Sequence, residues 1–289
     1  MQYTGLRGRV ALVTGTNNPQ GIGATIARAL AQEGVNLCLH YFRSHTSTST
    51  ITESPGEEFY HAQQSKGIEP LLKEFREMGV SCTAIEADLR EAESVPLILD
   101  YAEATVGAVE ILVNNACYWE ADTFLPSNAE LANKSVELWT ERPQTFCPEV
   151  FDKLFLSNTR AVAYLITEFA RRHIARGADW GRIISISTDG AYCFPSEVSY
   201  GAAKIAIEGY SRSAAVELGK FGITVNVISP GPIQTGWITQ ELEEAILPKL
   251  LVQRMGKPED IANTALFLTS DQAEWITGQV IHVGGGNHI

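Results

Sequence analysis

The sequence predicts an α/β fold, a single doubly wound parallel β-sheet with helices on both of its faces. Short apolar segments of strand character alternate with amphipathic helical segments along nearly the whole chain, which is the pattern of a parallel sheet. The first strand also leads into a glycine-rich turn and then into a helix. Because we find neither an internal repeat nor a linker, we expect residues 1–289 to form one domain.

The composition argues against several classes of protein: nucleic-acid-binding, membrane, secreted and metal-binding proteins. The 289 residues include 22 Lys and Arg against 34 Asp and Glu, a formal charge of −12, which argues against nonspecific binding to nucleic acid or to an anionic membrane. No apolar run approaches the roughly 18 residues of a membrane span, and the first residues lack the apolar region of a signal peptide. The five cysteines are scattered, and the six histidines lack metal-ligand spacing. We therefore expect a cytoplasmic protein with reduced thiols and no metal site.

The glycine-rich turn predicts a dinucleotide site. Residues 9–14 form a short apolar strand, and residues 24–35 after the turn have helical spacing. Gly15 would make the turn, Gly21 would let the backbone approach a pyrophosphate, and Gly23 would let the helix pack on the strand. The helix N-terminus would then attract the anion. A purely structural strand–helix turn is the alternative.

The end of the second strand favours NADP(H) over NAD(H). The strand covers residues 35–41 and is followed by Arg43 and Ser44, with no acidic residue at its end. An acid there would bind the ribose diol of NAD, whereas an arginine suits the extra phosphate of NADP. A solvated loop arginine is the alternative. The Ser- and Thr-rich residues 44–54 are expected to form a mobile surface loop.

The rest of the chain continues the alternation. We expect helices over residues 68–78, 95–105, 151–172, 199–218 and 258–269. We expect strands over residues 80–87, 111–113, 181–188, 223–228 and 279–283. Segments 118–148 and 233–255 are expected to be loops around the substrate.

A tyrosine and a lysine one helical turn apart are the candidate proton-transfer pair. Tyr200 and Lys204 lie at i and i+4 with three small residues between them, so both project from one face of the expected helix. A nearby ammonium lowers a tyrosine pKa and makes the phenol a better proton-transfer group. The strand upstream ends in Ser187 and Thr188, which would deliver a hydroxyl beside Tyr200. A packed tyrosine before a solvated lysine is the alternative.

Several short motifs follow one another in a fixed order. They are TG…GIG (14–23), ADL (87–89), NNA (114–116), Asn158, YxxxK at Tyr200 and Lys204, PG…T (230–235) and the tail ITGQVIHVGGG. Together they resemble the short-chain dehydrogenase/reductase (SDR) family over nearly the whole chain, with similarity to its β-ketoacyl-ACP reductase-like members. The segment HYFRS is also similar to the NADP-phosphate segment of pteridine reductases in that family.

The resemblance implies a Rossmann fold and hydride transfer between NADP(H) and a carbonyl or secondary alcohol. Tyr200 would give the proton, and Lys204 would lower the tyrosine pKa and hold the nicotinamide ribose. Thr188 or Ser187 would orient the carbonyl, and Asn158 would anchor a relay water. The implied cofactor-binding residues are Gly15, Asn17, Asn18, Gly21, Ile22, Tyr41, Arg43, Ser44, Asp88, Leu89, Asn115, Ala116, Tyr200, Lys204, Pro230, Gly231, Ile233 and Thr235.

Four features depart from the family pattern. The first loop has five residues between Gly15 and Gly21 where the family usually has three, and Cys117 adds bulk where NNAG has glycine. Counting along the strand places the family's serine at Thr188, whereas counting back from the tyrosine places it at Ser187. We favour Thr188, because a buried strand cannot slip without flipping its faces. The segments 44–66 and 118–148 also look longer than usual.

The substrate and the assembly follow from resemblance alone. A β-ketoacyl thioester is the first expectation, and another small ketone, a sugar or a pterin stays open. Four loop aromatics are candidates for the pocket wall or for core packing: Trp119, Tyr192, Phe194 and Trp237. A non-catalytic NADP-binding regulatory protein is the alternative of another class, and a methyltransferase on a similar sheet is less favoured. By family habit, helices 151–172 and 199–218 would pair with another subunit in a homodimer or homotetramer.

Overall fold

The computed structural model describes residues 4–43, 54–138, 140 and 143–287. Its main sheet has seven strands, all parallel, in the order β3-β2-β1-β4-β7-β8-β9. The strands are β1 (Val10–Thr14), β2 (Asn36–Tyr41), β3 (Cys82–Glu86), β4 (Ile111–Asn114), β7 (Gly181–Ile186), β8 (Ile223–Pro230) and β9 (Val280–Val283). The doubly wound parallel sheet is confirmed.

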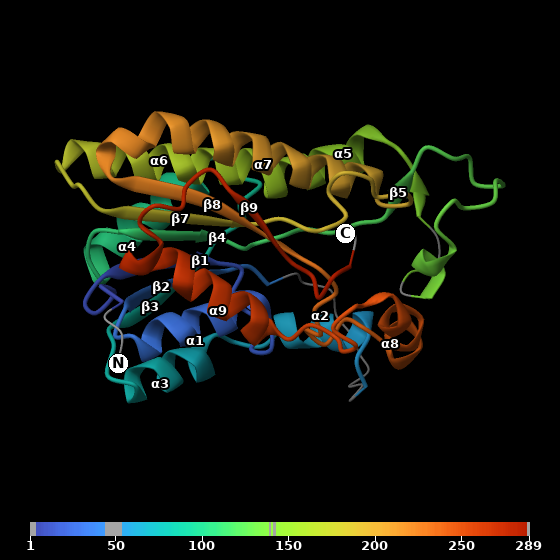
Figure 1. Ribbon diagram of the computed structural model, residues 1–289, viewed down its shortest axis with the longest axis horizontal. Coiled ribbons are helices and arrows are strands. Elements are labelled where there is room, and N and C mark those ends of the chain that lie inside the picture. Colours follow the sequence, from blue (N-terminus) through green and yellow to red (C-terminus); the bar gives the residue numbers. More distant parts are fainter. Residues whose placement is uncertain (1–3, 44–53, 139, 141–142, 288–289) are drawn as a thin grey trace.

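Helices cover both faces of the sheet. They are α1 (Ile22–Gln32), α2 (Glu57–Gln64), α3 (Glu69–Glu77), α4 (Ser94–Thr105), α5 (Pro148–Phe155), α6 (Ala161–Ala175), α7 (Val198–Leu218), α8 (Gln240–Ile246) and α9 (Pro258–Thr269). Short 3₁₀ turns cover Lys134–Leu138, Gly219–Phe221, Leu247–Lys249 and Asp271–Ala273. Helices α1 and α9 lie on one face, and α4, α6 and α7 lie on the other (Figure 1). None of the described helices is long and apolar enough to cross a membrane.

The apolar core is divided in two by the sheet. Successive side chains of a strand point to opposite faces. Val13 packs in the cluster that contains Ile26 of α1 and Ile261 of α9. Its neighbour Leu12 packs in the cluster that contains Phe169 of α6. Strand β1 is therefore buried on both faces, as a continuous apolar run in a parallel sheet requires, whereas the edge strands β3 and β9 are only partly buried.

The strand order reverses at β1. This strand pairs with β2 on one side and with β4 on the other, and chain connections leave in opposite directions from this point. In open α/β sheets, ligands bind at the carboxyl ends of the strands next to such a reversal. The glycine-rich turn after β1 and the polar residues after β4 lie at this edge.

The helix expected over residues 151–172 is interrupted. Helix α5 ends at Phe155, a π-helical turn covers Leu156–Arg160, and α6 continues from Ala161. Asn158 is fully buried within this turn. A π turn widens one turn of a helix and re-aims its side chains, which a periodicity count along the sequence cannot detect.

Four further elements were not expected from the sequence. Helix α2 is polar along most of its length, and Gln63 is its buried residue. Helix α8 lies within segment 233–255. Strands β5 (Asp122–Thr123) and β6 (Gln144–Thr145) pair in a small second sheet within segment 118–148. Residues 44–53 of the expected surface loop lie outside the described residues.

Candidate active site

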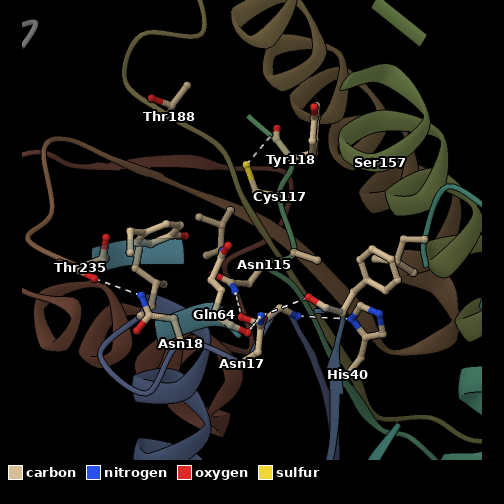
Figure 2. A pocket seen from close by; sticks show the side chains of 18 of the residues that line it. Asn17, Asn18, His40, Gln64, Asn115, Cys117, Tyr118, Ser157, Thr188 and Thr235 are labelled. Atoms are coloured by element: carbon tan, nitrogen blue, oxygen red, sulfur yellow. Dashed lines mark hydrogen bonds between the residues drawn. The ribbon is translucent and has the colours of Figure 1, made fainter. Parts of the chain in front are cut away.

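A cavity of about 600 Å³ lies at the carboxyl ends of the central strands (Figure 2). The site residues expected from the sequence line it, except Tyr41, Asn158 and Ser44. Ser44 lies outside the described residues. In Figure 2, Asn17, Asn18 and His40 lie at one end of the cavity, and Cys117 and Thr188 lie toward the other.

The glycine-rich turn is fixed against β4. Gly15 has φ +72°, and a Cβ there would lie 2.6 Å from the Cα of Ala116, so a larger residue would clash. The side chain of Asn115 donates to the carbonyls of Thr14 and Gly15, both at 2.9 Å. In return, the Thr14 hydroxyl accepts from the backbone N–H groups of Asn115 and Ala116. Asn115 therefore shapes the turn that would receive a phosphate.

The two asparagines of the enlarged loop act as cross-links. The side-chain amide of Asn17 donates to the carbonyls of Phe42 at 3.2 Å and Gln64 at 2.7 Å. The amide of Asn18 donates to the carbonyl of Thr235 at 3.0 Å. The loop is thus joined to the end of β2, to α2 and to the segment after β8, while both residues still line the cavity.

His40 is a cavity residue that the sequence analysis missed. Its Nδ1 accepts from the Gly15 N–H at 3.4 Å, and its Nε2 lies 2.9 Å from the Ala87 carbonyl. Burial lowers the pKa of His40 to about 4. The neutral His40 ring thus connects the end of β2, to which it belongs, with Gly15 after β1 and Ala87 after β3. Its place at the end of a buried strand, in HYFRS, was the signal available in the sequence.

An acidic residue stands beside Arg43. The absence of an acid at the end of β2 is correct along the chain, but Glu86 of β3 pairs with Tyr41 in the sheet. The Arg43 Nε lies 3.0 and 3.1 Å from the two Glu86 oxygens, and this carboxylate raises the pKa of Arg43. Asp88 is likewise bound by Arg90, a second cavity-lining arginine. The two arginines at this end of the cavity are therefore each paired with a carboxylate, Arg43 with Glu86 and Arg90 with Asp88.

Tyr200 and Lys204 both line the cavity from α7. Lys204 is buried, donates to the Ile186 carbonyl at 2.9 Å, and has its Nζ 5.7 Å from the centre of the Tyr200 ring. The lowering of the Tyr200 pKa by Lys204 stays a prediction, and the net shift has the opposite direction. Burial is the largest influence and raises that pKa well above its ordinary value, and the Cys117 thiol raises it further.

The two hydroxyls at the end of β7 have different surroundings. The Ser187 hydroxyl is buried and donates to the Glu208 carboxylate at 2.8 Å, on the side of α7. Thr188 is half-buried on the cavity wall, where its hydroxyl meets the Gly190 N–H at 3.4 Å. Both residues line the cavity, so the choice of Thr188 over Ser187 stays a prediction.

The cavity can thus hold a dinucleotide and a carbonyl. One end offers glycine-rich backbone and the N-terminus of α1, and the other offers a protonated phenol and a free hydroxyl beside a buried ammonium. Among the residues that the structure describes, no group of three or more His, Cys, Asp or Glu could hold a metal ion.

Residues 56–288 match the family model described as enoyl-(acyl carrier protein) reductase. An uncharacterized oxidoreductase of Bacillus subtilis is 34% identical over 279 residues, covering 96% of both chains. The 3-oxoacyl-[acyl-carrier-protein] reductase FabG of Staphylococcus aureus is 31% identical over 283 residues, covering 96% of this chain and 98% of its own. A short-chain dehydrogenase/reductase from Serratia marcescens has 27% identity and a TM-score of 0.75, covering 98% and 99% of the two chains. The chain belongs to the short-chain dehydrogenase/reductase family.

A second solved SDR-like structure contains a cofactor. It is a blue fluorescent protein from a metagenomic library in complex with NADPH, with 28% identity, a TM-score of 0.75, and coverage of 97% of this chain and 98% of that one. The expectation of an SDR oxidoreductase with a Rossmann fold is therefore confirmed.

In this SDR, Asn158 holds the segment that follows β4. Its Oδ1 accepts from the Tyr118 N–H at 2.8 Å, and its Nδ2 donates to the Tyr118 carbonyl at 2.7 Å. Both polar ends of the side chain therefore bond the backbone of Tyr118, which lines the cavity. The relay-water role expected for Asn158 stays a prediction.

The aromatic wall of the SDR pocket differs from the expected one. Trp119, Tyr192, Phe194 and Trp237 do not line the cavity, whereas Tyr60 and Tyr118 do. The ring centres of Trp119 and Trp237 are 5.0 Å apart, and Trp237 lies 5.2 Å from Tyr60. Trp237 thus packs against the cavity-lining residue Tyr60, and Trp119 packs against Trp237. Tyr60 could have been found only by recognising the short polar helix α2.

Proposed function

We propose that this SDR reduces the carbonyl of a small molecule with NADPH, or runs the reverse oxidation. The observation that carries the proposal is the convergence of Tyr200, Thr188 and Lys204 at one end of a cavity whose other end has a dinucleotide-type turn. The cofactor supplies the hydride. The chain supplies the orientation of the carbonyl and the proton.

Each residue then has one task. The Tyr200 hydroxyl, kept protonated by its raised pKa, donates the proton to the carbonyl oxygen. The Thr188 hydroxyl donates a hydrogen bond that orients the same oxygen. The Lys204 ammonium, held by the Ile186 carbonyl, would also bind the ribose next to the nicotinamide.

NADP(H) is proposed over NAD(H) because Arg43 and Arg90 both line the end of the cavity beyond β2. A phosphate there would take Arg43 from Glu86 or share it, since a guanidinium can donate five hydrogen bonds. The NADPH named for the solved blue fluorescent protein supports the same choice.

A β-ketoacyl thioester is a second candidate substrate. The 31% identity to FabG over almost the whole chain favours it. We also propose that the protein is a single-domain cytoplasmic enzyme that works as a homodimer or homotetramer.

The test is oxidation of NADPH and of NADH by the purified protein against acetoacetyl thioesters, diketones, hydroxyketones, sugars and pterins. We expect turnover with NADPH, and a loss of at least about 100-fold in kcat for Tyr200→Phe with unchanged NADPH affinity. Near-normal turnover of that variant would contradict the assignment of Tyr200. A clear preference for NADH would contradict the role of Arg43. Tight NADPH binding without turnover across the panel would favour a regulatory protein.

A further inference from the structure

Asp189, the residue after Thr188, is bound by the C-terminal segment of the chain. Its Oδ2 accepts a hydrogen bond from the Asn287 Nδ2 at 2.7 Å, and both side chains are half-buried. A hydrogen bond to a carboxylate is roughly twice as strong as one between neutral groups. The contact therefore ties the segment after β7 to the last residue that the structure describes.

The Asp189 carboxylate also lies against the wall of the cavity. A Cβ on Gly231, which lines the cavity, would lie 3.1 Å from the Asp189 Oδ2 and 2.6 Å from the Cα of Gly284. The Asp189 N–H donates to the Pro230 carbonyl at 2.9 Å. Asp189 is thus packed between the end of β8 and the C-terminal segment.

The C-terminal segment has attachments of its own. The Asn287 N–H donates to the Gly284 carbonyl at 3.1 Å, and the Gly285 carbonyl accepts from the Val252 N–H at 3.0 Å. Gly285 and Gly286 have φ +63° and +85°, so this turn requires glycine. The Asn287 amide is therefore presented to the carboxylate from a tight turn that is itself held by the segment after α8.

Thr188 lies beyond the end of its strand. Strand β7 ends at Ile186, and Thr188 lies on the connecting segment that follows (Figure 2). Its hydroxyl accepts from the Gly190 N–H at 3.4 Å, which is a long hydrogen bond. The direction of this hydroxyl thus depends on where the backbone is held, and Asp189 is the next residue of that backbone.

We propose that Asn287 is a positioning residue, which holds the backbone at Thr188 through Asp189 so that the Thr188 hydroxyl points at the reacting carbonyl. This inference rests on the proposed function, in which Thr188 orients that carbonyl. Asn287 and Asp189 do not line the cavity, so they act through Thr188 and not on the substrate. Because a displacement of about 1 Å near a reacting group can cost about 100-fold in rate, loss of this contact is expected to lower kcat.

The test breaks the contact and then rebuilds it with its two groups exchanged. Asn287→Asp places a carboxylate against the Asp189 carboxylate, which is unfavourable. We expect this variant to lower kcat for carbonyl reduction about tenfold, with NADPH affinity changed less than about twofold. In the double variant Asp189→Asn with Asn287→Asp, an amide again donates to a carboxylate, so kcat should return to within about threefold of wild type. The control Asn263→Asp adds the same charge at an exposed position of α9 and should leave kcat unchanged.

Two further measurements separate positioning from a structural role. In the Thr188→Ala background, Asn287→Asp should cause no further loss of kcat, because its effect passes through the Thr188 hydroxyl. The methyl NMR resonance of Thr188 should move in Asn287→Asp and return in the double variant. A loss of kcat that persists in the Thr188→Ala background, or that the exchange does not restore, would overturn the inference.

The NMR measurement also separates this failure from failure of the proposed function. If no carbonyl is reduced but the Thr188 resonance moves and returns as expected, the proposed reduction is rejected and the positioning of Thr188 by Asn287 is retained. Turnover with NADPH and an unmoved resonance in Asn287→Asp would reject the positioning and retain the proposed function. Neither turnover nor a moved resonance would reject both.

Discussion

The Sγ atom of Cys117 lies 3.7 Å from the hydroxyl oxygen of Tyr200. A negative charge on one of these groups disfavours a second negative charge on the other, so the thiol adds to the effect of burial and raises the pKa of Tyr200. The residue that breaks the family's NNAG pattern therefore touches the proposed proton donor.

Replacing Cys117 by alanine should make Tyr200 easier to ionise. The Tyr200 pKa should fall while remaining raised by burial, so the phenolate needed for alcohol oxidation becomes available at lower pH. The measurement is the pH dependence of kcat/KM for oxidation of an alcohol by NADP⁺, whose rising limb should move to lower pH. Cys193→Ala, an exposed cysteine outside the cavity wall, is the control. A limb that moves to higher pH, or not at all, would contradict the coupling.

The ion pair between Arg43 and Glu86 should control the choice of cofactor. Arg43→Ala should weaken NADPH binding about tenfold or more and leave NADH binding nearly unchanged, because only NADPH carries the extra phosphate. Glu86→Gln should strengthen NADPH binding, because it removes the carboxylate that competes for Arg43. Fluorescence titration of both cofactors measures these changes, and weaker NADPH binding by Glu86→Gln would count against competition.

Of the two hydroxyl residues after β7, we expect Thr188 to act in catalysis and Ser187 to stabilise the fold. Thr188→Ala should lower kcat with little change in stability, and Thr188→Ser should recover most of the rate. Ser187→Ala should destabilise the fold by about 1–3 kcal/mol, because the buried Glu208 carboxylate loses its donor. Steady-state kinetics and thermal unfolding of the three variants check this, and the reverse pattern would return the catalytic role to Ser187.

Glu197 should make stability fall with rising pH. The carboxyl is buried, which raises its pKa from 4.5 to about 7, although the Trp119 N–H donates to it at 2.5 Å. The folded state therefore holds its proton more tightly than the unfolded state, so this contribution is complete below pH 4.5 and is lost as pH rises to about 7. Glu197→Gln should remove roughly 3 kcal/mol of this dependence between pH 5 and 8. Urea unfolding at both pH values measures it, and parallel pH profiles for variant and wild type would refute it.

The sequence analysis predicted the main sheet well because buried parallel strands are continuous apolar runs. It also predicted the cavity, since residues at the carboxyl ends of such strands share one edge. The choice of Thr188 over Ser187 followed from strand register alone and stays a prediction, because both residues line the cavity.

The features that the sequence analysis did not predict depend on contacts between elements that are distant in sequence. Glu86 meets Arg43 because β3 pairs with β2, and no local pattern contains that pairing. Tyr60 lines the cavity on helix α2, which is held at its ends by hydrogen bonds from Gly56 to the Gly236 carbonyl and from the Asn17 side chain to the Gln64 carbonyl. The sequence of α2 itself is too polar to indicate this packing. The rise of the Tyr200 pKa on burial was also absent from the sequence analysis, because desolvation depends on packing that a residue spacing does not describe.

His40 has a consequence for how the enzyme responds to acidity. Since its pKa is about 4, its imidazole carries no charge in any medium near neutrality. Its contacts with Gly15 and Ala87 therefore persist unchanged across that range. An uncharged partner thus holds the glycine-rich turn in one shape across a pH range in which other groups around the cavity gain or lose protons.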